Sequence, residues 1–393
     1  MNVLILPSWY PYDSNDTGGS FFREQALALK EQGCTVAVLT QQLRPLRNWR
    51  SIFLGRYGVT YENDQEVSTF RKHGMKWFPW MENFQAWQCK KNLLGAFERY
   101  MQAYGQPDII HVHSMLYAGW AAKSISQKYN IPYIITEHSS LYERGLITKN
   151  QKKLAKKISE SASKRFAVSS SFAKFLSAYF KEKGVAWGVM PNMVTSPFFN
   201  ASSDNSDESK PFSFVGIGSL TKRKGYDILM KAFAQVLKVQ PDVRLIIGGV
   251  GSEQPELQSL AKKCGISDKV DLLGALSRKQ VVQHILSSDV FVHSSFYETF
   301  GVVLIEALAL GRPVISTRCG GPEDIVREQD GILVDVGDEG SLAEAMLHLY
   351  AHRKTYDRGE LREACYERFS EKVVINKLMQ VYRELLEEEC KRG

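Results

Sequence analysis

The sequence predicts an α/β protein made of two doubly wound domains, each with a parallel sheet covered by helices. Short apolar runs rich in β-branched residues alternate with longer amphipathic stretches along most of the chain. One segment, residues 191–211, interrupts this pattern and is rich in Ser, Asn, Asp and Pro, as linkers are. The length of 393 residues also suits two domains, at roughly 100–200 residues each.

The first half of the chain predicts an N-terminal domain over residues 1–195. Helical patterns at 20–33 and 118–130 separate apolar runs, and this βαβ order predicts a parallel sheet with helices on both faces. The predicted strands of this domain are residues 2–7, 34–40, 108–114, 132–137 and 164–169.

The same rhythm resumes after the linker and predicts a C-terminal domain over residues 196–369. Its predicted strands are residues 212–218, 243–249, 269–274, 289–294, 313–317 and 331–335, and its helices include 224–239, 300–310 and 339–350. An amphipathic segment follows, and we expect a terminal helix at about 370–393 that packs back on the first domain. Ligands of such sheets bind beyond the carboxyl ends of the strands, so we expect a cleft where the two domains face each other.

Composition narrows the class of partner. The net charge of +7 suits anionic ligands or an anionic membrane surface but is too small to indicate nucleic acid. Six scattered cysteines without a CxxC pair predict free thiols in a reducing compartment. The N-terminal apolar run lacks the basic flank of a signal peptide, and no run reaches the ~18 residues of a membrane span. We therefore expect a cytoplasmic protein, soluble or peripheral at the inner face of the membrane.

Two glutamates, Glu298 and Glu306, bracket a mostly apolar run at the start of a predicted helix. Eight helical residues span ~12 Å, so the two carboxylates cannot share one proton or one metal ion. A helix N-terminus at the end of a parallel strand favours anions, and glycine allows close approach to the backbone. The backbone N–H groups expected at this site belong to Thr299, Phe300, Gly301 and Val302.

A nucleotide sugar would fit this pattern. A diphosphate would lie on the helix N-terminus, Glu306 would bind the ribose diol, and Glu298 would bind hydroxyls at the other end. For an isolated pair of glutamates, solvated helix residues are the better interpretation, so the surrounding sequence has to decide between the two.

The surrounding block, SSFYETFGVVLIEALALGRPVIST (294–317), resembles the signature of the family 4 retaining glycosyltransferases, which have the GT-B fold of two Rossmann-like domains. GSLTKRKGYDIL (218–229) resembles the family's phosphate-binding segment, and VDLLGALSRKQV (270–281) resembles its nucleobase-binding strand and loop. GGSFFREQALALKEQGCTV, DIIHVHS, IITEHSS and VMPNMV also fit, in the same order, in the first half. The resemblance covers nearly the whole chain except about 41–105.

The resemblance implies a retaining sugar transfer without an enzymic nucleophile and without a metal cofactor. Lys224 and Arg223 would stabilise the leaving diphosphate, although a solvated basic turn is the ordinary alternative. Ser219 stands where the family usually carries an arginine, and we hypothesise that Arg223 replaces that guanidinium.

Further site residues follow from the same resemblance. His138 and Glu298 would face the donor sugar, and both are predicted catalytic residues. Gly18, Gly19, Ser219, Gly274 and Leu276 would line the donor site. His111 and His113 lie on the same face of one predicted strand. Together with His138 they provide only weak evidence for a metal site.

Residues 41–105 carry basic and aromatic clusters, including LRPLRNWRSIFLGRYG and KHGMKWFPWMENFQAW. Two interpretations explain this composition. In the first, the aromatic residues are half-buried on solvated helices; in the second, the region forms a surface that binds an acceptor and an anionic membrane. The family binds its acceptor with the N-terminal domain, which favours the second interpretation.

The resemblance implies transfer of a hexose-type sugar from a nucleotide-diphosphate donor to a hydroxyl of a glycan or lipid-linked acceptor, and the choice of a UDP-linked donor rests on the family alone. The match in the first half suggests bacterial polysaccharide or glycolipid synthesis, by analogy. A phosphorylase, a nucleotide-sugar epimerase and a non-catalytic sugar-nucleotide-binding protein remain as alternatives.

Overall fold

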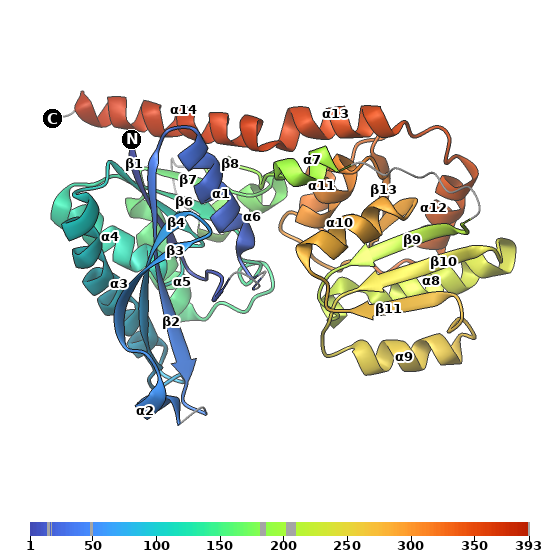
Figure 1. Cartoon of the computed structure of the whole chain (residues 1–393), viewed down its shortest axis with the longest axis horizontal. Coiled ribbons are helices and arrows are strands. Elements are labelled where there is room, and N and C mark those ends of the chain that lie inside the picture. Colours follow the sequence, from blue (N-terminus) through green and yellow to red (C-terminus); the bar gives the residue numbers. More distant parts are fainter. Residues whose placement is uncertain (14–15, 17, 48–49, 181–185, 202–209, 392–393) are drawn as a thin grey trace. The chain divides into compact units, whose positions relative to one another are not determined.

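The computed structural model describes residues 1–393 except 14–15, 17, 48–49, 181–185, 202–209 and 392–393. The chain forms two compact units, which we describe separately. Unit 1 comprises Met1–Pro191 and Val374–Gly393, and unit 2 comprises Asn192–Val373. Each unit is a sheet flanked by helices, as the alternation of apolar runs predicts (Figure 1).

Unit 1 contains an eight-stranded sheet in the order β3-β4-β2-β1-β5-β6-β7-β8. Its strands are β1 (Asn2–Pro7), β2 (Thr35–Pro45), β3 (Gly58–Asp64), β4 (Val67–Lys76), β5 (Ile109–His113), β6 (Tyr133–Glu137), β7 (Lys164–Ala167) and β8 (Gly188–Val189). All neighbouring pairs are parallel except β3 and β4. The strand order reverses between β1 and β5, which are neighbours in the sheet. This switch point is where doubly wound sheets bind ligands.

Helices complete unit 1. They are α1 (Ser20–Glu31), α2 (Ser51–Leu54), α3 (Glu82–Tyr104), α4 (Ala118–Tyr129), α5 (Lys149–Ser161), α6 (Ser170–Phe180) and, from Val374 onward, α14 (Glu371–Cys390). The predicted helices 20–33, 118–130 and about 370–393 correspond to α1, α4 and α14, whereas α2, α3 and α6 were not predicted. The α14 helix buries Tyr382, whose hydroxyl lies 2.7 Å from Nδ1 of His111 in β5. Met379 of α14 contacts Cys34 beside β2.

The predicted strand list omits the region 41–105, where unit 1 has substantial structure. β2 runs on to Pro45, β3 and β4 form an antiparallel hairpin at the sheet edge, and α3 follows. The hairpin turn contains Gln65 and Glu66, both with positive φ. These residue types rarely adopt that conformation, so the sequence carries no ordinary turn signal there.

Unit 2 contains six parallel strands in the order β11-β10-β9-β12-β13-β14. They are β9 (Phe212–Ile217), β10 (Val243–Gly248), β11 (Val270–Gly274), β12 (Val290–His293), β13 (Val314–Thr317) and β14 (Gly331–Val334). All six were predicted, because parallel strands buried on both faces read as continuous apolar runs. The order reverses between β9 and β12, which places the switch point of unit 2 there.

The helical segments of unit 2 are α7 (Ser196–Asn200), η1 (Lys222–Lys224), α8 (Tyr226–Val239), α9 (Gln254–Lys263), α10 (Arg278–Leu286), α11 (Val302–Ala309), η2 (Gly321–Asp324), α12 (Glu339–Ala351) and α13 (Arg358–Phe369). The α7 helix lies within the predicted linker 191–211, of which residues 202–209 are outside the described part. Two helix starts differ from the prediction: α8 begins at Tyr226 after a separate 3-10 turn, and α11 begins at Val302.

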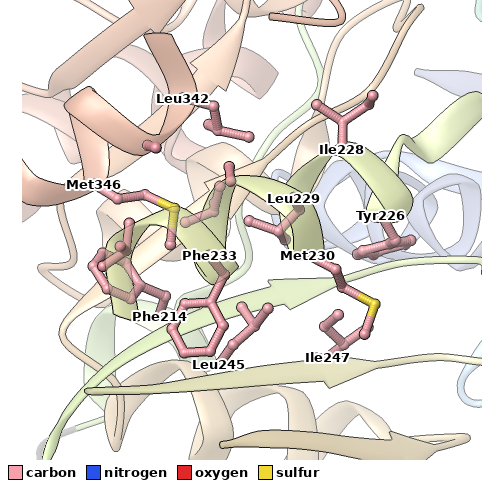
Figure 2. Packing of buried hydrophobic residues seen from close by; sticks show 14 of the residues in the cluster. Phe214, Tyr226, Ile228, Leu229, Met230, Phe233, Leu245, Ile247, Leu342 and Met346 are labelled. Atoms are coloured by element: carbon pink, nitrogen blue, oxygen red, sulfur yellow. The ribbon is translucent and has the colours of Figure 1, made fainter. Parts of the chain in front are cut away.

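The core of unit 2 lies between its sheet and the pair of helices α8 and α12 (Figure 2). Phe233 and Leu229 from α8 and Met346 and Leu342 from α12 are buried against β9 and β10. Each such side chain contributes about 1.5–3 kcal/mol when fully buried. This packing fixes the β9 end and the start of α8, between which the candidate site lies. Within the described residues, no helix is both long enough and apolar enough to cross a bilayer.

Candidate active site

Two loops meet at the switch point of unit 2. One leads from β9 through η1 to α8, and the other leads from β12 to α11. The backbone N–H of Phe296 donates to the carbonyl of Arg223 at 2.8 Å, and the Ser294 hydroxyl donates to the carbonyl of Lys224 at 3.0 Å. These bonds hold the basic turn of η1 directly against the segment that carries Glu298.

Gly225 makes this close approach possible. It has φ of +61°, and a Cβ atom on it would lie 2.2 Å from the carbonyl oxygen of Ser294. Only glycine accepts both the left-handed backbone and such a short distance. The geometry of the cluster therefore depends on this residue.

The side chain of Glu298 lies between several cationic or polar groups. Lys224 Nζ is 2.6 Å from Glu298 Oε2, and Arg223 Nη1 is 3.5 Å from the same oxygen. Arg223 also donates to the carbonyl of Tyr297 at 3.1 Å. His293, the last residue of β12, places Nε2 at 3.7 Å from Glu298 Oε2. Three predicted site residues thus come together, and a fourth residue, His293, joins them.

Burial and the neighbouring charges shift the pKa of Glu298 in opposite directions. Burial raises the pKa of Glu298, but attraction to Lys224 and hydrogen bonding to His293 hold that pKa well below its usual range. Burial lowers the pKa of His293, which is therefore neutral at pH 7. The carboxylate is ionised, and two cations surround it. An anionic ligand would be attracted to the same two cations.

The helix α11 follows the cluster and is preceded by the remaining predicted backbone donors. Gly301, with φ of +103°, is the N-cap of α11, and Val302 is its first residue. Thr299 and Phe300 lie before the helix and are both buried. The first-turn amide groups of α11 lack helical acceptors, so this end of the helix carries a partial positive charge.

Glu306 lies on the second turn of α11 and is only 1% exposed. Its carboxylate accepts a hydrogen bond from Arg278, at the start of α10. The Arg278 guanidinium also stacks over the ring of Phe198, 4.6 Å from its centroid. The carboxylate predicted to bind a ribose thus already has a cationic partner, which no pattern in the sequence predicts.

The remaining predicted donor residues of unit 2 lie in loops at the ends of β9 and β11. Ser219 is exposed after β9. Gly274 ends β11 with φ of +74°, and its carbonyl accepts from the N–H of Gly249 at 2.8 Å. Leu276 packs against Gly248, where a Cβ atom would lie 2.5 Å from Cδ1 of Leu276.

The switch point of unit 1 carries the other predicted residues. Gly18 is exposed, whereas Gly19 is buried, has φ of +86° and is the N-cap of α1. The indole of Trp9 lies against Gly19 and the ring of Phe22. His138, after β6, packs edge-on against Phe22 with ring centroids 5.1 Å apart.

Three histidines form a contiguous group in unit 1. His113 Nδ1 lies 3.1 Å from His138 Nε2, and His111 contacts the hydroxyls of Tyr382 and Thr136. Burial lowers the pKa of both His111 and His138 to about 3, and it lowers the pKa of His113 well below its usual value. The group is therefore neutral at pH 7. Within the described ranges, no three His, Cys, Asp or Glu side chains are arranged to hold a metal ion.

Glu137, the last residue of β6, positions the loop that holds His138. Its carboxylate accepts from the backbone N–H groups of Met115, His138 and Ser139 at 2.8–3.0 Å. Burial raises the pKa of Glu137 to about 7. Glu137, His293 and Arg278 were not singled out from the sequence. The position of Glu137 and His293 at strand ends would have indicated them, whereas Arg278 carries no such signal.

Comparison with known proteins identifies related families, sequences and folds. The family described as glycosyl transferases group 1 matches residues 199–370, and the family described as glycosyltransferase family 4 matches residues 18–195. The chain is 31% identical over 180 residues to the N-acetyl-alpha-D-glucosaminyl L-malate synthase of Bacillus anthracis, covering 44% of this chain. That match spans less than half, 46%, of the relative's length.

A longer match joins the chain to the D-inositol 3-phosphate glycosyltransferase of Paenarthrobacter aurescens. The two are 26% identical over 306 residues, which cover 73% of this chain and 75% of the relative. The similarity therefore extends across the boundary between the two units.

Two solved structures resemble the fold over almost the whole chain. Sucrose-phosphate synthase from Thermosynechococcus elongatus has a TM-score of 0.78 at 22% identity, over 98% of this chain and 99% of the other. HepE of Anabaena in complex with UDP has a TM-score of 0.72 at 17% identity, over 98% of this chain and 100% of the other.

The two doubly wound sheets and these structural matches define a protein of the GT-B fold, as predicted. The two family matches lie in tandem and together leave little of the chain uncovered. The chain belongs to the family 4 glycosyltransferases, a family of sugar-transferring enzymes.

Proposed function

We propose that this protein transfers a sugar from a UDP-linked donor to a hydroxyl of a glycan or lipid-linked acceptor, with retention of anomeric configuration. The observation that carries the proposal is the cluster of Lys224, Arg223 and Glu298 at the switch point of unit 2. A diphosphate bound at the start of α11 would meet two cations and the partial positive charge of the helix. HepE, a structural relative, is known in complex with UDP, which supports the choice of nucleotide.

In this proposal the protein contributes orientation and electrostatic stabilisation. Lys224 and Arg223 turn from Glu298 toward the leaving diphosphate, whose negative charge grows as the glycosidic bond breaks. Glu298 then accepts hydrogen bonds from the hydroxyls of the sugar, and Glu306 accepts them from the ribose. Retention would come from acceptor attack on the face that the diphosphate leaves, with a phosphate oxygen taking the acceptor proton.

We also propose that no metal cofactor takes part. The two cations and the N-terminus of α11 supply the positive charge that a divalent ion would otherwise supply. Chelation with EDTA should therefore leave the transfer rate unchanged, and restoration of lost activity by added Mg²⁺ or Mn²⁺ would contradict this part of the proposal.

The acceptor and its membrane are part of the same proposal. Large aromatic side chains are exposed before and within α3, and two lysines of α3 lie over tryptophan rings. The exposed aromatic residues are Trp77, Phe78, Trp80 and Trp87, and Met81 is exposed beside them. Such a surface suits an anionic bilayer and a lipid-linked acceptor of bacterial polysaccharide or glycolipid synthesis. Flotation with anionic vesicles, but not with neutral ones, is the expected result.

A donor-consumption assay tests the central proposal. Purified protein is incubated with UDP-, GDP- and ADP-sugars and a pool of glycan and lipid acceptors, and released nucleotide is measured by chromatography. We expect acceptor-dependent release of UDP, reduced roughly 10²–10³-fold in Lys224→Met. Lys231→Met is the matched control, because Lys231 pairs with Glu339 at the surface of the same unit.

Other outcomes of this assay would contradict the proposal in recognisable ways. Isomerised UDP-sugar without released UDP would indicate an epimerase. Sugar phosphate formed from a glycan and inorganic phosphate would indicate a phosphorylase. Tight UDP-sugar binding with no turnover on any acceptor would indicate a sugar-nucleotide-binding protein.

A further inference from the structure

Unit 1 contains a cavity of about 530 Å³ that neither the donor site nor the histidine group uses. It lies beside the β3–β4 hairpin, the second half of β2 and the loop after β1. Its lining residues are Tyr12, Asp13, Gln42, Arg44, Gly55, Arg56, Glu62, Asn63, Asp64, Arg71 and His73. A cavity lined almost wholly by polar and charged side chains is suited to a polar ligand.

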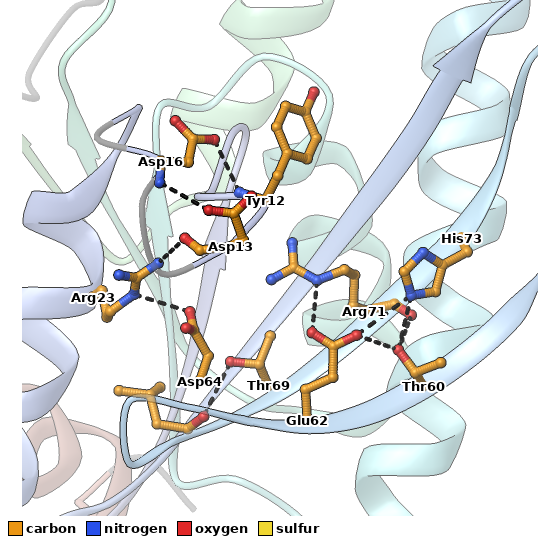
Figure 3. A network of polar contacts seen from close by, with 11 residues as sticks. Tyr12, Asp13, Asp16, Arg23, Thr60, Glu62, Asp64, Thr69, Arg71 and His73 are labelled. Atoms are coloured by element: carbon orange, nitrogen blue, oxygen red, sulfur yellow. Dashed lines mark hydrogen bonds and ion pairs between the residues drawn. The ribbon is translucent and has the colours of Figure 1, made fainter. Parts of the chain in front are cut away.

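Two of the three carboxylates that line this cavity are already paired with arginines (Figure 3). Glu62 accepts from Arg71 Nε at 3.0 Å and from the Thr60 hydroxyl at 2.8 Å. Asp64 accepts from Nε of Arg23 at 2.9 Å. The charges of Glu62 and Asp64 are therefore compensated within the protein. The third lining carboxylate, Asp13, is exposed and accepts from the backbone N–H of Asp16 at 3.1 Å.

Several guanidinium groups, in contrast, have donors to spare. The side chain of Arg71 is only 2% exposed, and its Nη1 has no hydrogen-bond partner among the described residues. Arg44 donates from Nη1 to the carbonyl of Arg56 at 2.6 Å, while its buried Nε and Nη2 have no partner within the same described set. Leaving buried donors unsatisfied costs roughly 1–3 kcal/mol each, and more for charged groups.

The surrounding aromatic rings hold these guanidinium groups in place. Arg71 lies over the ring of Tyr10 at 5.8 Å, and Arg44 lies over the ring of Tyr57 at 4.9 Å. Figure 3 shows the Arg71 guanidinium between the Asp64–Arg23 group and the Glu62–His73 group. Groups fixed in this way lose little conformational entropy when a ligand binds.

We infer that this cavity binds the carboxylate or phosphate group of an anionic saccharide. Guanidinium groups bind both oxyanions through paired N–H donors, and the spare donors of Arg71 and Arg44 would serve this purpose. Resting on the proposed function, the inference makes the bound saccharide part of the acceptor, recognised by its charge. The cavity and the donor cluster lie in different units, so each can be tested without the other.

Ligand-observed NMR titrations of the full chain test the inference with three probes: glucuronate, glucose 6-phosphate and uncharged glucose. We expect at least one charged probe to bind clearly more tightly than glucose. Arg44→Gln should weaken that binding roughly tenfold or more, since it removes two of the spare donors. Arg99→Gln, at an exposed position of α3 outside the lining, is the matched control.

A second variant covers the more deeply buried side chain. Arg71→Lys keeps a cation beside Glu62 but removes the paired N–H donors, and it should also weaken binding of the charged probe. Thermal unfolding of each variant shows whether the fold is retained. Preference for glucuronate identifies a carboxylate and preference for glucose 6-phosphate identifies a phosphate; either result supports the inference.

Equal binding of all three probes, or unchanged binding in both arginine variants, would overturn it. Titration of the same samples with UDP separates this failure from failure of the proposed function. If UDP binds but neither charged sugar does, only the anionic-acceptor inference is lost. If UDP fails to bind, the proposed function itself is contradicted.

Discussion

Each unit has a cluster of buried polar side chains at its switch point, but the cluster of unit 2 is charged and that of unit 1 is neutral. In unit 2, Glu298 stays ionised because Lys224 and Arg223 surround it. In unit 1, the three histidines stay neutral because burial lowers their pKa values. The same fold position therefore supports two kinds of chemistry: a charged cluster that can exchange one anion for another, and a neutral imidazole that can donate or accept a hydrogen bond.

We expect the two clusters to differ most in the free energy of unfolding that is lost when one side chain of the cluster is replaced. Lys224→Met leaves an ionised carboxylate with only Arg223 nearby, and we expect a loss of about 3 kcal/mol in the free energy of unfolding. His138→Gln replaces one neutral polar group by another and should cost about 1 kcal/mol or less. Denaturant unfolding followed by circular dichroism measures both.

A double variant sharpens this expectation. Lys224→Met combined with Glu298→Gln removes both charges, so it should recover much of the lost stability without recovering sugar transfer. If the double variant is as unstable as Lys224→Met alone, the uncompensated carboxylate is not the cause of the loss.

The glycines that precede α8 and α1 provide the next contrast. A Cβ at Gly225 would meet the backbone oxygen of Ser294 at 2.2 Å, whereas one at Gly19 would meet the Trp9 side chain at 2.9 Å. Backbone moves less readily than a half-exposed indole, so Gly225→Ala should lose about 2–4 kcal/mol and Gly19→Ala distinctly less. Gly33→Ala, with φ of +80° and open space around it, measures the conformational cost alone. Equal losses at all three positions would show that the contact with Ser294 is unimportant.

A substitution of Glu306 tests whether this buried carboxylate of unit 2 binds the ribose of the donor. Glu306→Gln keeps the shape but weakens the bond to Arg278 and the proposed bonds to the diol, so the KM for the donor should rise roughly tenfold with little change in kcat. Glu339→Gln, at the half-exposed surface, is the control. A fall in kcat with an unchanged KM would place Glu306 outside the donor-binding contacts.

The last contrast is the pH dependence of unit 1. Below pH 6.5 the unfolded chain protonates its histidines while the folded state does not, so stability falls by up to ~1.4 kcal/mol per pH unit for each buried histidine. Glu137 opposes this trend, because its pKa of about 7 favours the folded state as the pH falls from 7 toward 4.5. In unit 2, His293 contributes in the same direction but is one group against three, and Glu298 adds to it only below pH 4.5.

Hydrogen exchange at pH 7.5, 6.5 and 5.5 measures this difference. Protection of β5 and β6 should decrease before that of β9 and β12, and His113→Gln should reduce the acid sensitivity. Equal decreases in both sheets would show that the histidines are not responsible.

Where the sequence predicted the structure well, the signal was local. The predicted strands of both units appear as apolar runs. Lys224 and Glu298 were both predicted at the donor site, but the ion pair between them was not predicted. The β3–β4 hairpin was missed because its turn uses Gln65 and Glu66, and its strands carry the polar side chains that line the anionic-saccharide cavity. The Arg278–Glu306 pair joins two consecutive helices, α10 and α11, across 28 residues of sequence, and no local pattern indicates it.

The chain passes from unit 1 to unit 2 and back again, since residues 374–390 of α14 return to the first sheet. On the ribosome, the strand that carries His111 emerges long before Tyr382, its buried hydroxyl partner. Unit 1 therefore cannot complete its interior until α14 has been synthesised, whereas every part of unit 2 precedes that stage. A nascent chain stalled after unit 2 has emerged but before α14 has done so should contain a mature second unit beside a first unit that proteases still cleave.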